Sequence, residues 1–249
     1  MRFLAQSAIQ PEQAGSIVSY DVRRRGDGYE IVRDGVLEDV QFDSHNVLGV
    51  VYRRVQRDAL AAWPGAALLH AITGRWQGMR FVVVGEGLWD RSRLALQLIR
   101  HGVEIEGDDI AILHDGVLTT YPRPLRVCGV DAPLPPSAPA IADLPCAGPD
   151  PSAGPWALDL VLAGIDWRIT SGGPDIAIAL ETNYGGQTRI RKLPSVEIAR
   201  ILMASCDPLS ARSHAAGAIA RLAGGARCYK LRLGSLDDIS DAWLSRVRW

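Results

Sequence analysis

The residues best suited to chemistry lie in a glycine-bearing turn between an apolar run and an amphipathic segment. Residues 81–84 (FVVV) form a β-branched and aromatic run of strand length, and Gly85 and Gly87 mark the turn that follows. Apolar residues then recur at helical spacing from Leu94 to Ile99. Strand, glycine turn and helix in this order form the layout of a phosphate-binding loop, where free backbone N–H groups at a helix N-terminus face an anion.

The fixed positions of this turn match the phosphate-loop pattern G-x-x-x-x-G-K followed by Ser or Thr only at its two ends. Gly85 takes the first glycine position and Ser92 the hydroxyl position, whereas Asp90 and Arg91 stand where the pattern has glycine and lysine. Arginine binds phosphate through a planar fork that is longer and wider than an ammonium. A carboxylate at ~5 Å from a phosphate charge, at an effective dielectric near ~20, costs on the order of 3 kcal/mol. Asp90 therefore opposes nucleotide binding unless a nearby arginine or Mg²⁺ offsets its charge.

Two further groups of chemical interest flank this loop. Asp108 and Asp109 lie between two apolar strand halves, residues 103–105 and 110–113, where a carboxylate without a role is costly. Consecutive residues on a strand point to opposite faces, so only one of the pair can aim at the loop unless the strand bulges. His70 lies in an apolar strand before the loop. It either hydrogen-bonds one aspartate and tunes its pKa, or is a satisfied core histidine.

The composition of the 249-residue chain limits the classes of function. A hydrophobic content of 47% supplies a sizeable core, and a formal net charge of −1 gives no global reason to expect nucleic acid or a membrane as a partner. No apolar stretch is long enough to span a bilayer, and the N-terminus lacks the apolar run of a signal peptide. Widely spaced cysteines favour free thiols in a reducing cytoplasm: Cys128, Cys146, Cys206 and Cys228. The sequence therefore predicts a soluble, cytoplasmic protein.

The N-terminal part of the chain predicts a separate small sheet. Residues 14–42 alternate in polarity around tight-turn signals, which is typical of an antiparallel β meander. Such a meander either caps a larger sheet or provides a partner-docking surface. We expect it to form a unit over residues 1–45, packed on the core of a main domain over residues 46–249. A long Pro-, Ala- and Gly-rich loop is expected at 131–155.

The main domain is expected to mix strands with flanking helices, which makes the fold class α/β or α+β. A hairpin turn at 75–78 should join the histidine strand to the strand before the loop. The expected strands cover residues 66–72, 79–84, 103–105, 110–113, 117–121, 158–169, 176–181, 188–193 and 228–233. The expected helices cover residues 47–62, 94–101, 195–203, 209–222 and 236–247.

Three of these segments follow one another in a recognisable order. They are LLHAI at 68–72, VVVGEGLWDRSRLALQLIRHG at 82–102, and VEIEGDDIAIL at 103–113. A Leu-His strand, a phosphate loop with its short helix, and an Asp-Asp pair in this order resemble the HPr serine kinase/phosphorylase family, specifically the shorter HPr kinase-related proteins. The similarity extends over nearly the whole chain, but only these three segments are specific.

The resemblance implies a P-loop-containing, HPr kinase-like domain that transfers phosphate from ATP to a serine or threonine hydroxyl. The acceptor would belong to a small protein or a ribosomally made peptide, and Mg²⁺ would be the second cofactor. One of Asp108 and Asp109 would deprotonate the acceptor while the other lies near the metal, with His70 beside them. Phosphate-binding candidates are Gly85, Gly87, Asp90, Arg91, Ser92 and Arg123, and metal-ligand candidates are Ser92, Asp109 and Glu181.

Two readings of the same resemblance remain besides an active kinase. One is a catalytically degenerate protein that binds a peptide or a partner enzyme, with the loop closed by a contact between Asp90 and an arginine. The other is an enzyme that uses the arginine-bearing loop for a different anion. For Arg123, between two prolines, phosphate binding and a plain surface charge are both open. Better-known members of the family assemble as hexamers, so a homo-oligomer is also an expectation of the resemblance.

Overall fold

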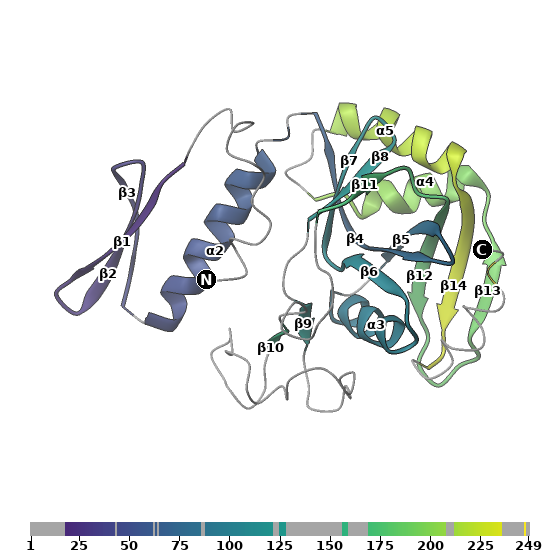
Figure 1. Cartoon of the computed structure of the whole chain (residues 1–249), viewed down its shortest axis with the longest axis horizontal. Coiled ribbons are helices and arrows are strands. Elements are labelled where there is room, and N and C mark those ends of the chain that lie inside the picture. The colour runs from purple at the N-terminus through teal and green to yellow at the C-terminus, as the bar shows by residue number, and fades with distance from the viewer. Residues whose placement is uncertain are drawn as a thin grey trace.

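The chain has a mixed α/β fold (Figure 1). The computed structural model describes residues 18–42, 44–61, 63, 65–85, 88–121, 125–127, 156–158, 169–207, 212–235 and 247. Within these residues, four helices accompany a three-stranded antiparallel sheet, a two-stranded pair and a nine-stranded mixed sheet. The predicted class, α/β or α+β, is confirmed at this level.

The nine-stranded sheet is the largest sheet in the described part of the chain. Its order is β11-β8-β7-β4-β5-β12-β14-β13, and β6 also pairs with β4. Strands β5 (Met79–Gly85), β12 (Ile176–Thr182) and β14 (Arg227–Leu233) are parallel, so their carboxyl ends lie at one edge of the sheet. In open α/β sheets this edge is where ligands bind. The other strands are β4 (Ala67–Trp76), β6 (Glu104–Gly107), β7 (Ile110–His114), β8 (Val117–Thr120), β11 (Ser171–Gly172) and β13 (Arg189–Lys192).

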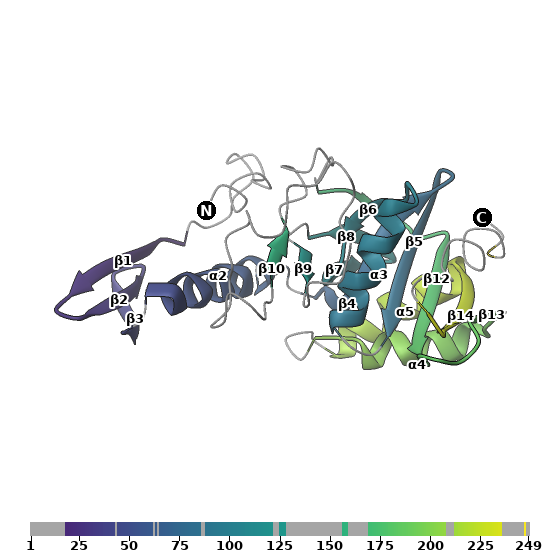
Figure 2. The ribbon, with the colours of Figure 1, turned by 90° about the horizontal axis from the view of Figure 1, so that it is seen from below.

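Helices cover both faces of this sheet, which explains why β5 is a continuous apolar run rather than an alternating one. α3 (Leu88–Arg100) covers one face, and α4 (Ser195–Ala204) and α5 (Arg212–Gly225) cover the other (Figure 2). Phe81 and Val83 pack in the cluster that contains the apolar residues of α3. Val82 and Val84 pack in the cluster that contains the apolar residues of α4 and α5. Successive side chains of one strand thus fix helices on opposite faces.

The three-stranded sheet packs on α2 (Ser44–Ala61). Strands β1 (Tyr20–Arg25), β2 (Gly28–Arg33) and β3 (Val36–Gln41) pair in order, and Ile31 lies with Val47 and Val51 in a small separate cluster. This unit extends to one side of the main sheet in Figure 1. The expected domain boundary between residues 45 and 46 falls inside α2. The first part of this helix packs against the meander. Near its other end, Leu60 packs with apolar residues of β4 and β7.

Most expected elements in the described residues are confirmed to within a few residues, including the hairpin turn at Gln77 and Gly78. The helix after the loop differs, because α3 begins at Leu88, six residues before the expected start at residue 94. Residues 88–93 show no apolar periodicity, but a helix propagates easily once its apolar face is anchored. Expectations for the loop at 131–155, the strand over 159–168 and the helix over 236–246 lie outside the described residues. In the described part, no helix is long and apolar enough to cross a membrane.

The two-stranded pair is formed by β9 (Leu125–Val127) and β10 (Trp156–Leu158), which run antiparallel. This pair forms a sheet separate from the nine-stranded sheet.

Candidate active site

The glycine at the end of β5 is required by the packing of two neighbouring strands. Leu180 of β12 pairs with Gly85 in parallel register. A Cβ atom on Gly85 would collide with the carbonyl oxygen of Leu180. Glycine therefore allows β12 to approach the strand end closely.

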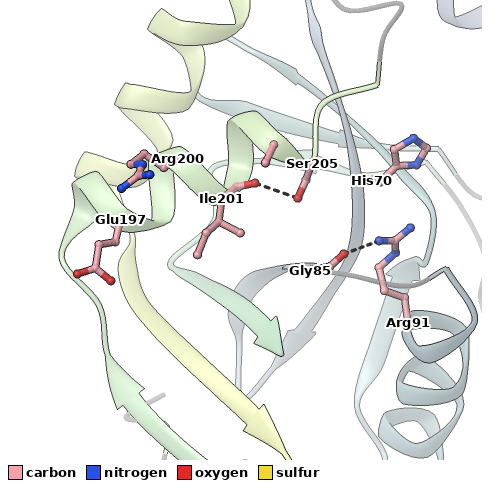
Figure 3. Close-up of a pocket in the computed structure, with 8 residues that line it drawn as sticks. His70, Gly85, Arg91, Glu197, Arg200, Ile201 and Ser205 are labelled. Carbon is pink, nitrogen blue, oxygen red and sulfur yellow. Dashed lines mark hydrogen bonds between the residues drawn. The ribbon is translucent and has the colours of Figure 1, made fainter. Parts of the chain in front are cut away.

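Arg91 folds back from α3 onto this strand end. Its Nη1 donates a hydrogen bond to the carbonyl oxygen of Gly85 at 2.8 Å (Figure 3). The side chain is almost fully buried. Arg91 stands at the sequence position where the phosphate-loop pattern has lysine, so the structure places a cation at the carboxyl end of β5, as the pattern would.

Ser92, the next residue, joins α3 to the aspartate pair. Its hydroxyl donates a hydrogen bond to Asp108 Oδ2 at 2.6 Å, and both side chains are buried. An O–H···O⁻ bond of this length is charge-assisted and stronger than a neutral one. The structure thus brings together two of the residues that the sequence singled out, one near the start of α3 and one beyond the end of that helix.

The strand that carries Asp108 and Asp109 is interrupted at the pair. β6 and β7 both pair with β4, but the register shifts between Thr73 and Gly74, and the two aspartates form a bend between the strands. Both carboxylates are buried. Asp108 reaches Ser92 on α3, while Asp109 Oδ1 lies 3.5 Å from His70 Nδ1 on β4. The bend is the irregularity that the sequence argument required if both carboxylates were to serve one site.

His70 lies between two carboxylates. Its Nε2 is 3.2 Å from Oδ2 of Asp207, opposite the contact of Nδ1 with Asp109. These contacts raise the pKa of His70 above its ordinary value: Asp109 is the largest cause and Asp207 adds to it, whereas partial burial and the nearby Arg91 oppose the rise. Asp109 raises this pKa through its hydrogen bond first and through its charge second, although 3.5 Å is long for a hydrogen bond.

The segment that supplies Asp207 is attached to β4 by an isolated antiparallel bridge between Leu69 and Cys206. The backbone N–H of His70 donates to the Ser205 carbonyl at 2.9 Å, and the N–H of Asp207 donates to the Leu68 carbonyl at 2.8 Å. Sequence reasoning missed Asp207, because nothing in its local pattern distinguishes it from any acidic residue after a helix. Only the return of the chain to β4 after α4 brings it to His70.

A pocket of about 730 Å³ opens between these residues and α4. This volume is within the range of roughly 300–1,000 Å³ that ligand pockets occupy. In Figure 3, Arg91 and His70 lie on one side and α4 lies on the other. The sequence did not indicate that α4 forms one wall of the pocket, because a solvent-exposed helix face has the same pattern of polar and apolar residues. The lining residues are His70, Gly85, Arg91, Glu197, Arg200, Ile201, Ala204 and Ser205.

The remaining candidates are placed elsewhere or cannot be placed. Glu181 of β12 contacts Lys230 and lies 3.4 Å from Arg232, and these cations, Lys230 first, lower its pKa. Gly87 and Arg123 lie outside the described residues, and so does the side chain of Asp90, whose backbone is in α3. Among the described side chains, no group of three or more His, Cys, Asp or Glu residues is arranged to hold a metal ion.

This arrangement combines three chemical abilities at one sheet edge. A buried hydroxyl is held by a carboxylate, an imidazole between two carboxylates faces a pocket, and an arginine lies beside the carboxyl end of β5. Such a site can hold an anion and accept a proton. A scan against protein-family models finds no match for this chain, and a search of curated proteins finds none either.

Proposed function

We propose that this protein is a P-loop-containing, HPr kinase-like enzyme that transfers phosphate from ATP to a serine or threonine hydroxyl of a small protein or a ribosomally made peptide. One observation carries the proposal: two consecutive buried carboxylates reach two different partners beside one pocket. Asp108 holds the Ser92 hydroxyl, and Asp109 faces His70. In phosphoryl transfer the protein mainly positions groups and neutralises charge, and these contacts suit that task.

The pocket suits the phosphates of a nucleotide. Arg91 and Arg200 line it from opposite walls, and Gly85 ends the strand at its base. Arginine is effectively always charged and binds phosphate oxygens through two N–H groups. One carboxylate, Glu197, is also in the lining, so the charged side chains of the lining leave an excess of one cation before His70 is counted.

Magnesium would be held by Ser92 and Asp108, since Asp109 faces His70. Mg²⁺ keeps several waters and needs only one or two protein carboxylates together with the phosphates, so these two residues suffice. Bound Mg²⁺ would neutralise part of the charge on the β- and γ-phosphates. The hydrogen bond from the Ser92 hydroxyl to Asp108 would hold both oxygens in place before the ion binds.

The proton of the acceptor hydroxyl would go to the His70–Asp109 pair. His70 lines the pocket and is about one-third exposed, with a side-chain exposure of 34%, whereas Asp109 lies behind it. The acceptor oxygen forms its bond to the γ-phosphorus as the bond from that phosphorus to the β–γ bridging oxygen breaks. ADP leaves, and the proton remains on the imidazole. Asp109 stabilises the imidazolium that results.

A second candidate has an observation of its own. Arg91 donates to the Gly85 carbonyl and is almost fully buried, so its guanidinium is engaged with the protein where a phosphate-loop lysine would face the nucleotide. If that contact persists in solution, the protein is a catalytically degenerate relative of such kinases that binds a peptide or a partner enzyme without phosphoryl transfer.

Calorimetry with ATP and Mg²⁺ separates the two candidates. The kinase proposal expects saturable heat, and it expects Arg91→Ala and Arg200→Ala each to weaken ATP binding by about tenfold, because each removes one charged phosphate contact. Arg100→Ala is the matched control: Arg100 is exposed at the far end of α3 and contacts Gln97. An absence of heat at millimolar ATP contradicts the kinase proposal and leaves the degenerate binding protein.

A further inference from the structure

Four cations share one face of the antiparallel strand pair formed by β13 and β14. The strand register pairs Arg189 with Arg232, and Arg191 with Lys230. Directly paired residues on adjacent strands lie on the same face, and so do residues two apart on one strand. All four side chains therefore project from one surface, at the edge of the nine-stranded sheet that β13 forms.

This cationic face continues to the pocket. Arg232 pairs in register with Glu181 of β12, and the preceding residue, Leu180, pairs with Gly85 at the pocket. On the other side, Arg191 Nη2 lies 3.8 Å from Glu197, which lines the pocket on α4. Arg200, one turn further along α4 than Glu197, also lines the pocket and adds a fifth cation (Figure 3).

The charges on this face are not balanced locally. Like charges directly opposite each other on neighbouring strands are destabilising. In the described part of the chain, the carboxylates found in contact with these cations are Glu181 and Glu197. Arg191 and Arg232 remain well exposed, with side-chain exposures of 60% and 51%. A chain with a net charge of −1 thus concentrates positive charge beside its pocket.

We propose that this face, formed by Arg189, Arg191, Arg200, Lys230 and Arg232, binds an acidic segment of the polypeptide substrate whose hydroxyl enters the pocket. The role of that hydroxyl rests on the proposed kinase function, whereas the binding of an acidic segment does not. Neighbouring strands lie ~4.8 Å apart, so the three steps from β5 to β13 span roughly 14 Å. An extended peptide rises about 3.3 Å per residue, which places the acidic residues about four positions from the acceptor.

Fluorescence anisotropy with the full chain tests this without nucleotide. The probe is a labelled synthetic peptide in which glutamate and serine alternate, and the comparison probes are an alternating glycine–serine peptide and a single-stranded oligonucleotide. We expect only the acidic peptide to bind appreciably, and we expect binding to weaken as salt is raised. The double variant Arg189→Glu/Arg191→Glu should weaken binding at least about tenfold, because it replaces two attractive contacts by repulsive ones.

Two matched variants keep the test sharp. Arg189→Lys/Arg191→Lys retains the charge and should retain binding, whereas Arg23→Glu/Arg24→Glu makes the same charge change on exposed β1 and should have no effect. Circular dichroism confirms that each variant is folded. Undiminished binding in Arg189→Glu/Arg191→Glu, or equal binding of the glycine–serine peptide, overturns the proposal, and tighter binding of the oligonucleotide overturns it in favour of nucleic acid. If the acidic peptide binds while calorimetry shows no ATP binding, only the kinase function fails.

Discussion

The hydroxyl of Ser92 donates a 2.6 Å hydrogen bond to Asp108, and this contact joins the helix after the glycine turn to the bend between β6 and β7. The contact is buried on both sides. It makes the aspartate pair and the turn one unit, although Ser92 lies near the start of α3 and Asp108 lies beyond the end of that helix. Its removal should therefore affect both the fold and the site.

Ser92→Ala should lower the free energy of unfolding by about 1–3 kcal/mol, because it removes the hydrogen-bond donor of a buried carboxylate. Urea unfolding followed by circular dichroism measures this change. Ser171→Ala is the control, since Ser171 is exposed and its hydroxyl forms an exposed hydrogen bond with Thr119; we expect a change within about 0.5 kcal/mol. Equal stability of Ser92→Ala and the unaltered protein would show that the contact contributes nothing.

Asp109→Asn should lower the pKa of His70, because Asp109 is the largest cause of its rise. A raised folded-state pKa adds stability that is present below the ordinary value of 6.5 and is lost as the pH increases through the raised pKa. In Asp109→Asn this pH-dependent part of the stability should shrink. The neutral imidazole, which accepts the proton, should also appear at lower pH, so the rising limb of any kinase activity should move to lower pH while the plateau falls.

Proton NMR titration measures this pKa directly, with the His70 signal assigned by its loss in His70→Gln. Asp207→Asn should lower the same pKa by less, because Asp207 contributes less than Asp109. His114→Gln is the control, as that histidine is exposed and lies at the end of β7 away from Ile110, the residue that pairs with His70, and it should leave the His70 titration unchanged. A larger effect from Asp207→Asn than from Asp109→Asn would refute this ranking.

The sequence predicted the core of the site because its residues are marked by local contrast. Gly85 interrupts a strand–helix pattern, and Asp108 and Asp109 interrupt an apolar run, so each stands out in a short window. The structure brings His70, Ser92 and the two aspartates together as that contrast suggested. Buried polar residues are informative because burial without a partner is unfavourable.

The rest of the site could not be predicted in this way. Asp207 and Arg200 lie on or just after α4, whose exposed residues look like any solvated helix face. Their positions depend on how α4 returns to β4, and that is set by long-range pairing such as the bridge between Leu69 and Cys206. The start of α3 was likewise hidden, since residues 88–93 have no apolar spacing although they are helical.

Glu106→Gln should lower the free energy of unfolding by about 3–5 kcal/mol, because it removes one partner of a buried ion pair. Arg80 donates to Glu106 through Nε at 3.0 Å and Nη2 at 3.1 Å, and Arg75 Nε donates at 2.9 Å. Glu106 lies two residues before Asp108, so the same network fixes β6 where the site begins. Glu104→Gln is the control, because Glu104 is exposed on the same strand.

The pH dependence of stability gives a second readout of this network. Burial favours the neutral form of Glu106, but hydrogen bonds and charge from Arg80, with help from Thr170 and Arg75, overcome it and lower the pKa. A lowered folded-state pKa gives stability that is present above the ordinary value and is lost as the pH falls through the folded value. Glu106→Gln should therefore lose less stability than the unaltered protein between neutral and acidic pH. Parallel acid-unfolding curves for the two proteins would contradict this assignment.

Gly85→Ala should destabilise the protein by about 1–3 kcal/mol and weaken ATP binding, because the added methyl collides with the Leu180 carbonyl and shifts the strand end that Arg91 contacts. Gly224→Ala makes the same change inside α5, where an added Cβ meets nothing within 4 Å, and it should be neutral or stabilising by up to about 1 kcal/mol. Urea unfolding and calorimetry with ATP and Mg²⁺ measure the two effects separately. If Gly85→Ala loses stability but binds ATP as the unaltered protein does, the close strand contact matters for folding alone, and the end of β5 is not part of the nucleotide site.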